Sequence, residues 1–310
     1  GGSGSLDADM PPFRVFTLNI WFDLKLREAR TKALLEVIRA TQPSICCLQE
    51  VVPEVAIELM KGLPGWICSD PGNGGTLGPY GVMMLLPPGT RVQFTFHELP
   101  SQMARRLLVA ELPDLAVGTV HLESLRNHST REQQLSICAE ALARFPNALL
   151  VGDFNFDSER NFSDPQMPLE NEALSRLQGF EDLWLQLRPD RGLTFNSAAN
   201  PYIAQTEKMR YDRIMAKLPD WSATSIDLIG DAPVDDLVKL SSWEREWIDR
   251  PPTPTRPQMR AARPVPCGDC QTPVRPAMAW IDVIPAETPP PVRRKLFLSD
   301  HFGLLATLEP

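Results

Sequence analysis

The sequence contains no apolar run that approaches the roughly 20 residues needed to span a membrane, and it does not begin with a secretory signal. Basic residues are fewer than acidic ones, 31 against 39, and the net charge of −8 argues against a general nucleic-acid coat protein. The same charge still allows an enzyme that acts on nucleic acid through a local basic groove. We expect no association with a membrane.

Cysteines are few and scattered, which argues against a disulfide framework. Cys46 and Cys47 are adjacent in an apolar run and Cys138 lies in a helical pattern, as is typical of reduced, buried thiols in an intracellular protein. Cys267 and Cys270 form a single Cys-x-x-Cys pair, and structural zinc usually takes four ligands, so we interpret this pair as a turn or loop. The sequence thus predicts an intracellular protein, nuclear or cytoplasmic.

The 310 residues and the apolar fraction of 43% suit one large α/β domain with a sizeable core. We expect residues 1–12, which begin Gly-Gly-Ser-Gly-Ser, to be a linker and disordered leader, and residues 13–310 to form a single catalytic domain. Prolines gather in residues 231–295, which predicts a surface insertion. Three interpretations of this insertion are open: a segment that docks a protein partner, a lid beside the site, or filler.

Hydrophobic periodicity predicts strands and helices in alternation. Residues 117–120 and 148–151 are apolar strands joined by a helix over residues 129–143, and open α/β sheets keep their sites just past such strand ends. Further strands are expected at residues 13–20, 44–50, 80–86, 92–98, 105–111, 209–215, 296–301 and 302–308, and further helices at residues 28–40, 54–61, 170–178 and 243–248.

Polar side chains recur at the ends of these strands. Each one alone has a structural interpretation, since a lone aspartate or asparagine often forms a turn and a lone histidine is usually a hydrogen-bonded core residue. Their convergence on the strand ends of one sheet is more typical of an active site. The set comprises Asn19, Glu50, His121, Asp153, Asn155, Asp212, Asp300 and His301.

These residue types suit metal-assisted hydrolysis of a phosphodiester. Magnesium is usually held by one or two carboxylates, and Glu50 is the predicted ligand of Mg²⁺, or of Mn²⁺ in its place. Asp153 is expected to orient and deprotonate the attacking water. The charge that develops on the phosphoryl oxygens would be stabilised by Asn19, Asn155 and a protonated His301.

Five motifs resemble the signatures of the endonuclease/exonuclease/phosphatase superfamily, in order and at comparable spacing. They are Thr17-Leu-Asn19, Leu48-Gln-Glu50, His121-Leu-Glu-Ser124, Gly152-Asp-Phe-Asn155 and Ser299-Asp-His301. Within the superfamily the resemblance is closest to the tyrosyl-DNA phosphodiesterase 2 family, through residues 103–108, 121–135, 209–214 and 299–305. It covers about residues 13–230 and 296–308.

The resemblance implies a deoxyribonuclease I-like fold, a four-layer α/β/β/α sandwich of two packed mixed sheets with the site at one end. It implies magnesium-dependent hydrolysis of 5′-phosphotyrosyl bonds to DNA, which leaves a 5′-phosphate, as in the repair of trapped topoisomerase adducts. The partner would be a DNA 5′ end that carries a protein adduct. By residue, the resemblance implies metal binding by Glu50, catalysis by Asp153 and His301, contacts around the scissile phosphate by Asn19, His121 and Asn155, and support of a histidine by Asp300 and Asp212.

Substrate contacts are predicted near these motifs at Arg126, Arg106, Phe195 and Trp21. The arginines could bind phosphates and the aromatic rings could stack on bases, while surface or packing roles stay open for all four. Two stretches depart from the family pattern: Thr194-Phe-Asn196 replaces Thr-Trp-Asp, and Phe156-Asp157 replaces a leucine and a basic residue. The second departure predicts the loss of a positive charge near the substrate.

Two alternatives stay open. The same catalytic residues could act on RNA or on another phosphodiester or phosphomonoester, because one fold hosts many substrates. The chain could also be a binding module on a degenerate hydrolase scaffold. The intact Glu50, Asp153, Asn155 and His301 argue against that alternative, since a binding module would tolerate their loss.

Overall fold

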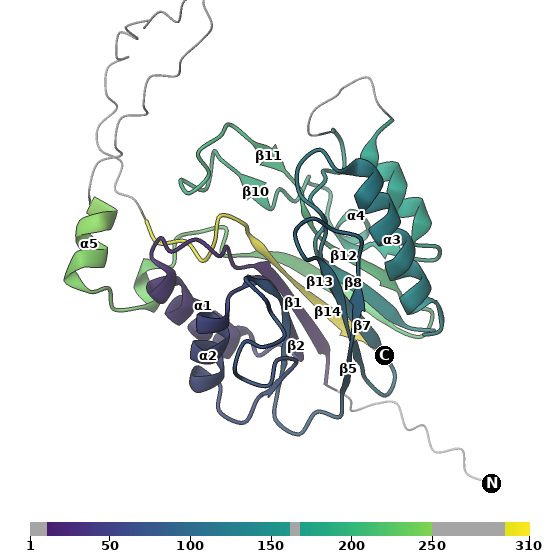
Figure 1. The fold of residues 1–310 in the computed structure, drawn as a ribbon, viewed down its shortest axis with the longest axis horizontal. Helices are drawn as coiled ribbons and strands as arrows, with labels where there is room; N and C mark the ends of the chain where they lie inside the picture. The colour runs from purple at the N-terminus through teal and green to yellow at the C-terminus, as the bar shows by residue number, and fades with distance from the viewer. Residues whose placement is uncertain (1–10, 162–167, 250–294) are drawn as a thin grey trace, which may run out of the picture. The chain divides into compact units, whose positions relative to one another are not determined.

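The computed structural model describes residues 11–161, 168–249 and 295–310. The chain divides into two units, one of residues 1–240 with 295–310 and one of residues 241–294. The larger unit contains both six-stranded β-sheets and every predicted site residue (Figure 1).

The first sheet has six strands in the order β13-β14-β1-β2-β4-β3. Strands β1 and β2 are parallel, because helix α1 (Arg27–Thr41) carries the chain back between them, and the other pairs are antiparallel. Helix α2 (Pro53–Gly62) follows β2. The strands are β1 (Phe13–Asn19), β2 (Ile45–Val51), β3 (Ile67–Cys68), β4 (Gly81–Leu86), β13 (Ser222–Ile229) and β14 (Gly303–Glu309).

The second sheet has the order β5-β6-β7-β8-β12-β9. Its one parallel pair, β7 and β8, is connected by helix α3 (His128–Ala143), as the sequence predicts. The strands are β5 (Gln93–Glu98), β6 (Arg106–Glu111), β7 (Ala116–His121), β8 (Ala148–Asp153), β9 (Glu181–Asp182) and β12 (Asp212–Lys217), and the short helix α4 (Leu183–Leu187) follows β9. Strands β10 (Phe195–Asn196) and β11 (Lys208–Met209) pair with each other.

The two sheets pack face to face with helices outside them, α1 and α2 on one side and α3 on the other (Figure 1). Alternate residues of β8 serve two cores: Leu149 and Val151 pack between the sheets with Val15 and Ile45, whereas Leu150 packs under α3. Because β8 is buried on both faces, it reads as a continuous apolar run that ends in a polar residue. The expected four-layer α/β/β/α sandwich is confirmed.

Three predicted elements differ from the structure. Residues 296–301 are a buried segment without regular structure, and strand β14 begins only at Gly303. The predicted strand at residues 209–215 is split, because the backbone N–H groups of Tyr211 and Asp212 donate to Thr194 Oγ1 between β11 and β12. The predicted helix at residues 170–178 is a 3₁₀ helix, η1 (Glu170–Arg176).

Strand β13 was not predicted from the sequence. Its outward residues are polar and several are serine or threonine, so its apolar pattern is weak. The strand forms because it pairs along its length with β14, a contact between segments about 80 residues apart in the chain.

In the smaller unit, helix α5 (Ser242–Asp249) lies where a short helix is expected. Glu244 Oε2 accepts hydrogen bonds from Ser241 N and Ser241 Oγ at the start of this helix, at 2.7 and 2.5 Å. The 3₁₀ helix η2 (Asp235–Leu237) belongs to the larger unit. Most of the predicted insertion, with Cys267 and Cys270, lies outside the described residues, as does most of the predicted leader.

None of the helices in the described residues is long and apolar enough to cross a membrane. Cys46, Cys47 and Cys138 are buried and free, as expected for reduced thiols.

Candidate active site

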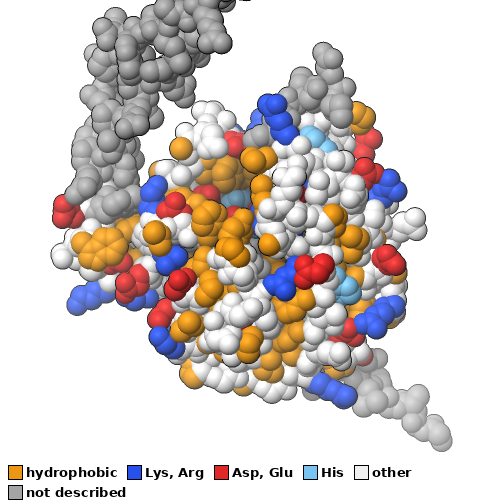
Figure 2. Space-filling model, viewed as in Figure 1, with side chains coloured by type: hydrophobic (Ala, Val, Ile, Leu, Met, Phe, Trp, Pro, Cys, Tyr) orange, Lys and Arg blue, Asp and Glu red, His pale blue; other side chains and the backbone are white. Residues whose placement is uncertain are grey.

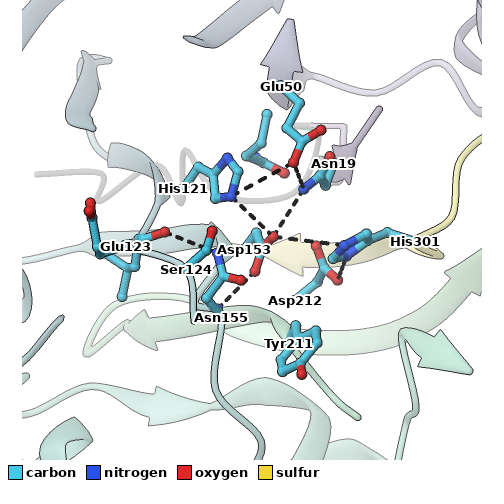
Figure 3. Close-up of polar contacts among 12 residues, drawn as sticks. Asn19, Glu50, His121, Glu123, Ser124, Asp153, Asn155, Tyr211, Asp212 and His301 are labelled. Atoms are coloured by element: carbon cyan, nitrogen blue, oxygen red, sulfur yellow. Dashed lines mark hydrogen bonds and ion pairs between the residues drawn. The ribbon is translucent and has the colours of Figure 1, made fainter. Parts of the chain in front are cut away.

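Polar side chains from the ends of several strands meet around Asp153 at one end of the sandwich (Figure 3). They come from both sheets, and this explains why they are far apart in the sequence. The first sheet contributes Asn19 at the end of β1 and Glu50 on β2, and the segment before β14 contributes His301. The second sheet contributes His121, Asp153 and Asp212 from β7, β8 and β12.

Gln49 ties the two sheets together just behind the site. Its buried Nε2 donates to Thr17 Oγ1 on β1 at 3.1 Å and to Thr119 Oγ1 on β7 at 3.0 Å. Asn19 and His121 each lie two residues beyond one of these threonines, and residues two apart on a strand face the same side. The buried glutamine therefore sets how closely Asn19 and His121 approach each other.

Several site residues have left-handed backbone conformations, which side chains other than glycine adopt at a cost. Glu50 has φ of 59° and lies where the register between β2 and β4 shifts, so the bulge turns its carboxylate out of the strand pattern. Trp21, Leu125 and Asn155 at neighbouring strand ends also have positive φ, of 58°, 64° and 57°. Strain of this kind is concentrated where the chain must aim side chains into a site.

Gly152, directly before Asp153, is required by a close approach of two strands. It has φ of 127°, and a Cβ atom at this position would lie 2.1 Å from Val120 O on β7. Any side chain here would push β8 away from β7 and so separate Asp153 from His121, its partner in the strand register.

Asn19 joins the two acidic residues of the site. Its Nδ2 donates to Glu50 Oε1 at 3.2 Å and to Asp153 Oδ2 at 3.0 Å, and its Oδ1 accepts from Trp21 N at 3.0 Å. The bond from Trp21 fixes which way the amide points. Both Nδ2 hydrogens are thus used to hold carboxylates, so Asn19 positions the acidic residues.

His301 is held as a cation. Its Nδ1 lies 2.8 Å from Asp212 Oδ2, and its Nε2 lies 3.9 Å from Asp153 Oδ2. Burial opposes the charge, but the carboxylates of Asp212 and Asp153 outweigh it and hold the pKa of His301 well above its ordinary value. A protonated His301 presents a donor N–H at Nε2 toward the centre of the site.

His121 is held in the neutral state. Burial and the neighbouring Arg105 guanidinium lower its pKa well below the ordinary value. Arg105 Nη1 lies 2.9 Å from His121 Nδ1, and since an arginine can only donate, Nδ1 accepts and the proton is on Nε2. That Nε2–H points toward Asp153 Oδ2, 3.5 Å away. The two histidines therefore differ in charge, and each presents a donor to the same centre.

The carboxyl groups of the buried Asp153 and the partly exposed Glu50 are subject to two opposing effects on their pKa. Burial raises the pKa of both carboxyl groups, and the cation of His301 acts against the rise. Asp153 Oδ1 accepts from Asn155 N at 2.8 Å, while Glu50 Oε2 accepts from Phe22 N at 3.0 Å. Asn155 Nδ2 donates to Leu122 O, which leaves its second amide hydrogen for a substrate oxygen.

The acidic residues fit a divalent cation. Asp153, Asp212 and His301 offer ligand atoms that lie within 4.8 Å of one another. Asp212 Oδ1 is buried and has no hydrogen-bond partner among the described residues, as expected of an oxygen that binds an ion or a water. Because a protonated His301 cannot bind a metal, the carboxylates, with the partly exposed Glu50 among them, are the better ligands.

The structure brings most of the predicted residues together but separates some. Asp300 does not bond His301: its Oδ1 accepts from Ser299 Oγ at 3.1 Å, and burial raises its pKa to about 6. Phe195, by contrast, contacts a site residue, because its ring packs edge-on against that of His301 with centroids 4.9 Å apart. Trp21 packs against Tyr202, and Arg126 is exposed on the loop between β7 and α3.

Of the two adjacent arginines, Arg105 rather than Arg106 contacts the site. Arg106 donates through Nη2 to Thr76 O and lies over the ring of Phe96 on the neighbouring strand β5. Residue alternation along a strand places adjacent side chains on opposite faces, and the sequence alone does not show which face meets the site.

Two charged residues have structural roles that sequence reasoning did not identify. Asp157 is buried, and its Oδ2 accepts from Arg210 N at 2.7 Å, so it holds the segment that leads to Asp212. The absence of a basic residue at this position stays a prediction about substrate binding, while Asp157 itself has a structural role. Arg30 is also buried and donates to the carbonyl oxygens of Ile20, Trp21, Asp23 and Lys25, which shapes the loop after β1.

A model of the endonuclease/exonuclease/phosphatase family matches residues 16–301. A comparison with curated proteins finds no match. Among solved structures, TDP2 from D. rerio complexed with single strand DNA product has 19% identity and a TM-score of 0.64, over 96% of this chain and 99% of that chain.

Two further structures extend the likeness. Truncated TDP2 from Caenorhabditis elegans has 19% identity and a TM-score of 0.61, over 96% of this chain and 98% of that chain. A mannosyl-6-phosphatase from Bacteroides thetaiotaomicron has 12% identity and a TM-score of 0.57, over 96% of this chain and 99% of that chain. At such identities the likeness establishes the fold and leaves the substrate to be inferred from the site.

Proposed function

Because the chain belongs to the endonuclease/exonuclease/phosphatase family, we propose that it is a magnesium-dependent phosphodiesterase that hydrolyses 5′-phosphotyrosyl bonds to DNA and leaves a 5′-phosphate. In a cell it would repair DNA 5′ ends that carry a topoisomerase adduct. The observation that carries the proposal is the pair of histidines, one neutral and one cationic, whose Nε2 atoms lie 3.5 and 3.9 Å from Asp153 Oδ2.

A cationic and a neutral histidine suit hydrolysis of a phosphodiester. His301 donates a charged hydrogen bond to a phosphoryl oxygen, where negative charge grows in the transition state. His121 donates a neutral one from Nε2, fixed by the bond between its Nδ1 and Arg105. When the surroundings of two neighbouring titratable groups shift their pKa values in opposite directions, the two groups commonly have different roles in catalysis.

Asp153 acts on the attacking water. Its Oδ1 and Oδ2 are held by Asn155 N and Asn19 Nδ2, so one carboxylate lone pair can accept the proton of the water. The water oxygen bonds to phosphorus, and the bond from phosphorus to the tyrosine oxygen breaks. The tyrosine leaves as a phenolate that takes a proton from solvent, and the DNA keeps a 5′-phosphate.

Glu50 is the proposed ligand of Mg²⁺, or of Mn²⁺ in its place, and the ion would add positive charge at the phosphoryl oxygens. Its carboxylate is oriented from both sides, by Asn19 Nδ2 and by Phe22 N. Asn19 therefore couples the position of the ligand to that of the base, Asp153.

Binding of a DNA strand is supported by the D. rerio TDP2 structure, which is complexed with single strand DNA product. In the second candidate the same residues act on RNA or on another phosphodiester or phosphomonoester, and the phosphatase among the similar structures supports the phosphomonoester.

The test is release of tyrosine from a single-stranded oligodeoxynucleotide with a 5′-phosphotyrosine, with Mg²⁺ or with chelator. An RNA of the same sequence and end and a 5′-phosphorylated oligonucleotide serve as competing substrates, and Asp153→Asn is the matched inactive control. Rapid, Mg²⁺-dependent cleavage of the DNA alone is expected. Cleavage of the RNA or of the monoester in its place would establish the second candidate.

A further inference from the structure

The loop after β1 carries an exposed aromatic ring beside the active site. Phe22 is 47% exposed, although a phenylalanine is usually buried. Its ring stacks on that of Tyr80, with centroids 5.0 Å apart and planes 16° apart, and Tyr80 in turn lies 6.4 Å from the ring of His121. The exposed Phe22 ring is thus connected to His121, a hydrogen-bond donor of the site, through the ring of Tyr80.

Phe22 is placed there by the site itself. Its backbone N–H donates to Glu50 Oε2 at 3.0 Å, so the carboxylate proposed to bind metal also fixes the residue that bears the ring. Arg30 holds the same loop through four carbonyl oxygens. A ring on a loop fixed in this way is pre-ordered, and little entropy is lost when a ligand stacks on it.

The loop of Tyr80 is equally well fixed. Asp70 accepts hydrogen bonds from the backbone N–H groups of Gly72, Asn73 and Gly74 and from both N–H and Oγ of Thr76. Arg105, which bonds His121, also lies over the Tyr80 ring, 5.3 Å from its centroid. The loops that carry Phe22 and Tyr80 are therefore both held by hydrogen bonds to buried side chains.

Figure 2 shows hydrophobic side chains around a hollow in which histidine atoms are visible.

We propose that Phe22 and Tyr80 form a stacking platform for an unpaired nucleobase, the first base next to the scissile phosphate. The inference rests on the proposed function and adds the substrate contact that selects a single-stranded end. A flat, exposed ring is suited to the face of any base, and stacking does not depend on sequence. The net charge of −8 weakens the overall electrostatic attraction to a nucleic-acid backbone, so stacking would supply a larger share of the affinity.

The test measures binding of the reaction product, so that it does not depend on cleavage. The probes are a 5′-phosphorylated tetrathymidylate and the same molecule with an abasic first nucleotide, each titrated into the wild-type chain with Mg²⁺. Loss of the base should weaken binding by about fivefold or more. In Phe22→Ala the ratio of the two dissociation constants, that of the abasic probe over that of the intact probe, should fall close to one, whereas Phe22→Tyr should restore the wild-type ratio.

Leu24→Ala is the matched control, because Leu24 is in the same loop and is 74% exposed. It should keep the wild-type ratio. Equal affinity of the wild-type chain for both probes, or an equal loss for both probes in Phe22→Ala, would overturn the platform. A ratio unchanged in Phe22→Ala together with slower release of a tyrosyl peptide would assign Phe22 to the protein adduct instead. If the chain releases no tyrosine but still binds the intact probe more tightly than the abasic probe, the proposed reaction is rejected and the platform is kept.

Discussion

Asp212 Oδ2 lies 2.8 Å from His301 Nδ1, while Asp212 Oδ1 has no hydrogen-bond partner among the described residues. The two oxygens of this carboxylate thus have different roles. Oδ2 fixes the tautomer and charge of the histidine, and Oδ1 is directed at the site. The sequence places Asp212 and His301 89 residues apart, so only the folded chain shows this relationship.

The first prediction concerns the charge of His301. In Asp212→Asn the amide no longer favours the imidazolium, so the pKa of His301 falls. Because the charged form is the active one, the alkaline limb of the rate profile should move to lower pH, and kcat at neutral pH should fall about 10²-fold or more. The measurement is kcat/KM against pH. Asp227→Asn, at an exposed aspartate paired with Arg188, is the control. An unshifted alkaline limb would refute the assigned role of Asp212.

The second prediction concerns the water and the phosphoryl oxygens. Asp153→Asn cannot accept the proton of the water, and His301→Ala removes the charged donor. Each variant should lower turnover by about two orders of magnitude or more. Tyrosine release from the 5′-tyrosyl oligonucleotide is the measurement, with circular dichroism to show that the variants fold. A folded variant with a nearly normal rate would be incompatible with the proposed mechanism.

The third prediction concerns metal binding. Glu50→Ala removes the proposed ligand, so the concentration of Mg²⁺ needed for half-maximal rate should rise, and isothermal titration should show weaker Mg²⁺ binding. Asp300→Asn is the comparison, because Asp300 is adjacent to His301 in sequence, while its side chain accepts a hydrogen bond from Ser299 Oγ. An unchanged titration in Glu50→Ala would place the ion on Asp153 and Asp212 instead.

The fourth prediction concerns the loop that supports Tyr80. Burial raises the pKa of Asp70, but hydrogen bonds from Thr76, Gly74 and Gly72 outweigh it, and the pKa lies below its ordinary value. Such a group stabilises the fold fully above the unfolded pKa of about 3.9 and loses that contribution as pH falls through the folded value. Asp70→Asn should therefore lower the free energy of unfolding by about 1–3 kcal/mol at pH 7 and by less below about pH 4.

Urea denaturation at both pH values measures the difference, with the exposed Asp114→Asn as the control. An equal loss of stability in Asp70→Asn at pH 7 and at acid pH would show that its carboxylate charge is not what holds the loop.

Local patterns were enough to predict most of the fold. Strands such as residues 45–51 and 148–153 are buried on both faces, so their apolar runs are visible in the sequence. Helix α3 is indicated by Leu135, Cys138 and Leu142, which recur at helical spacing and are buried. Strand β13 was missed because its stability comes from pairing with β14 and not from its own composition. The apolar pattern of residues 296–301 predicts a strand, because a buried segment without regular structure gives the same pattern.

By itself the sequence identified most of the polar residues that meet around Asp153, because the motifs that contain them lie at the ends of predicted strands, but it did not identify Arg105. Only the tertiary structure decided what each residue does. Charge states depend on burial and on distances between groups that are far apart in the sequence: burial and Arg105 keep His121 neutral, and Asp212 keeps His301 charged. Exposure is likewise a property of the fold, and it separates Phe22, which faces solvent, from Trp21, which packs against Tyr202.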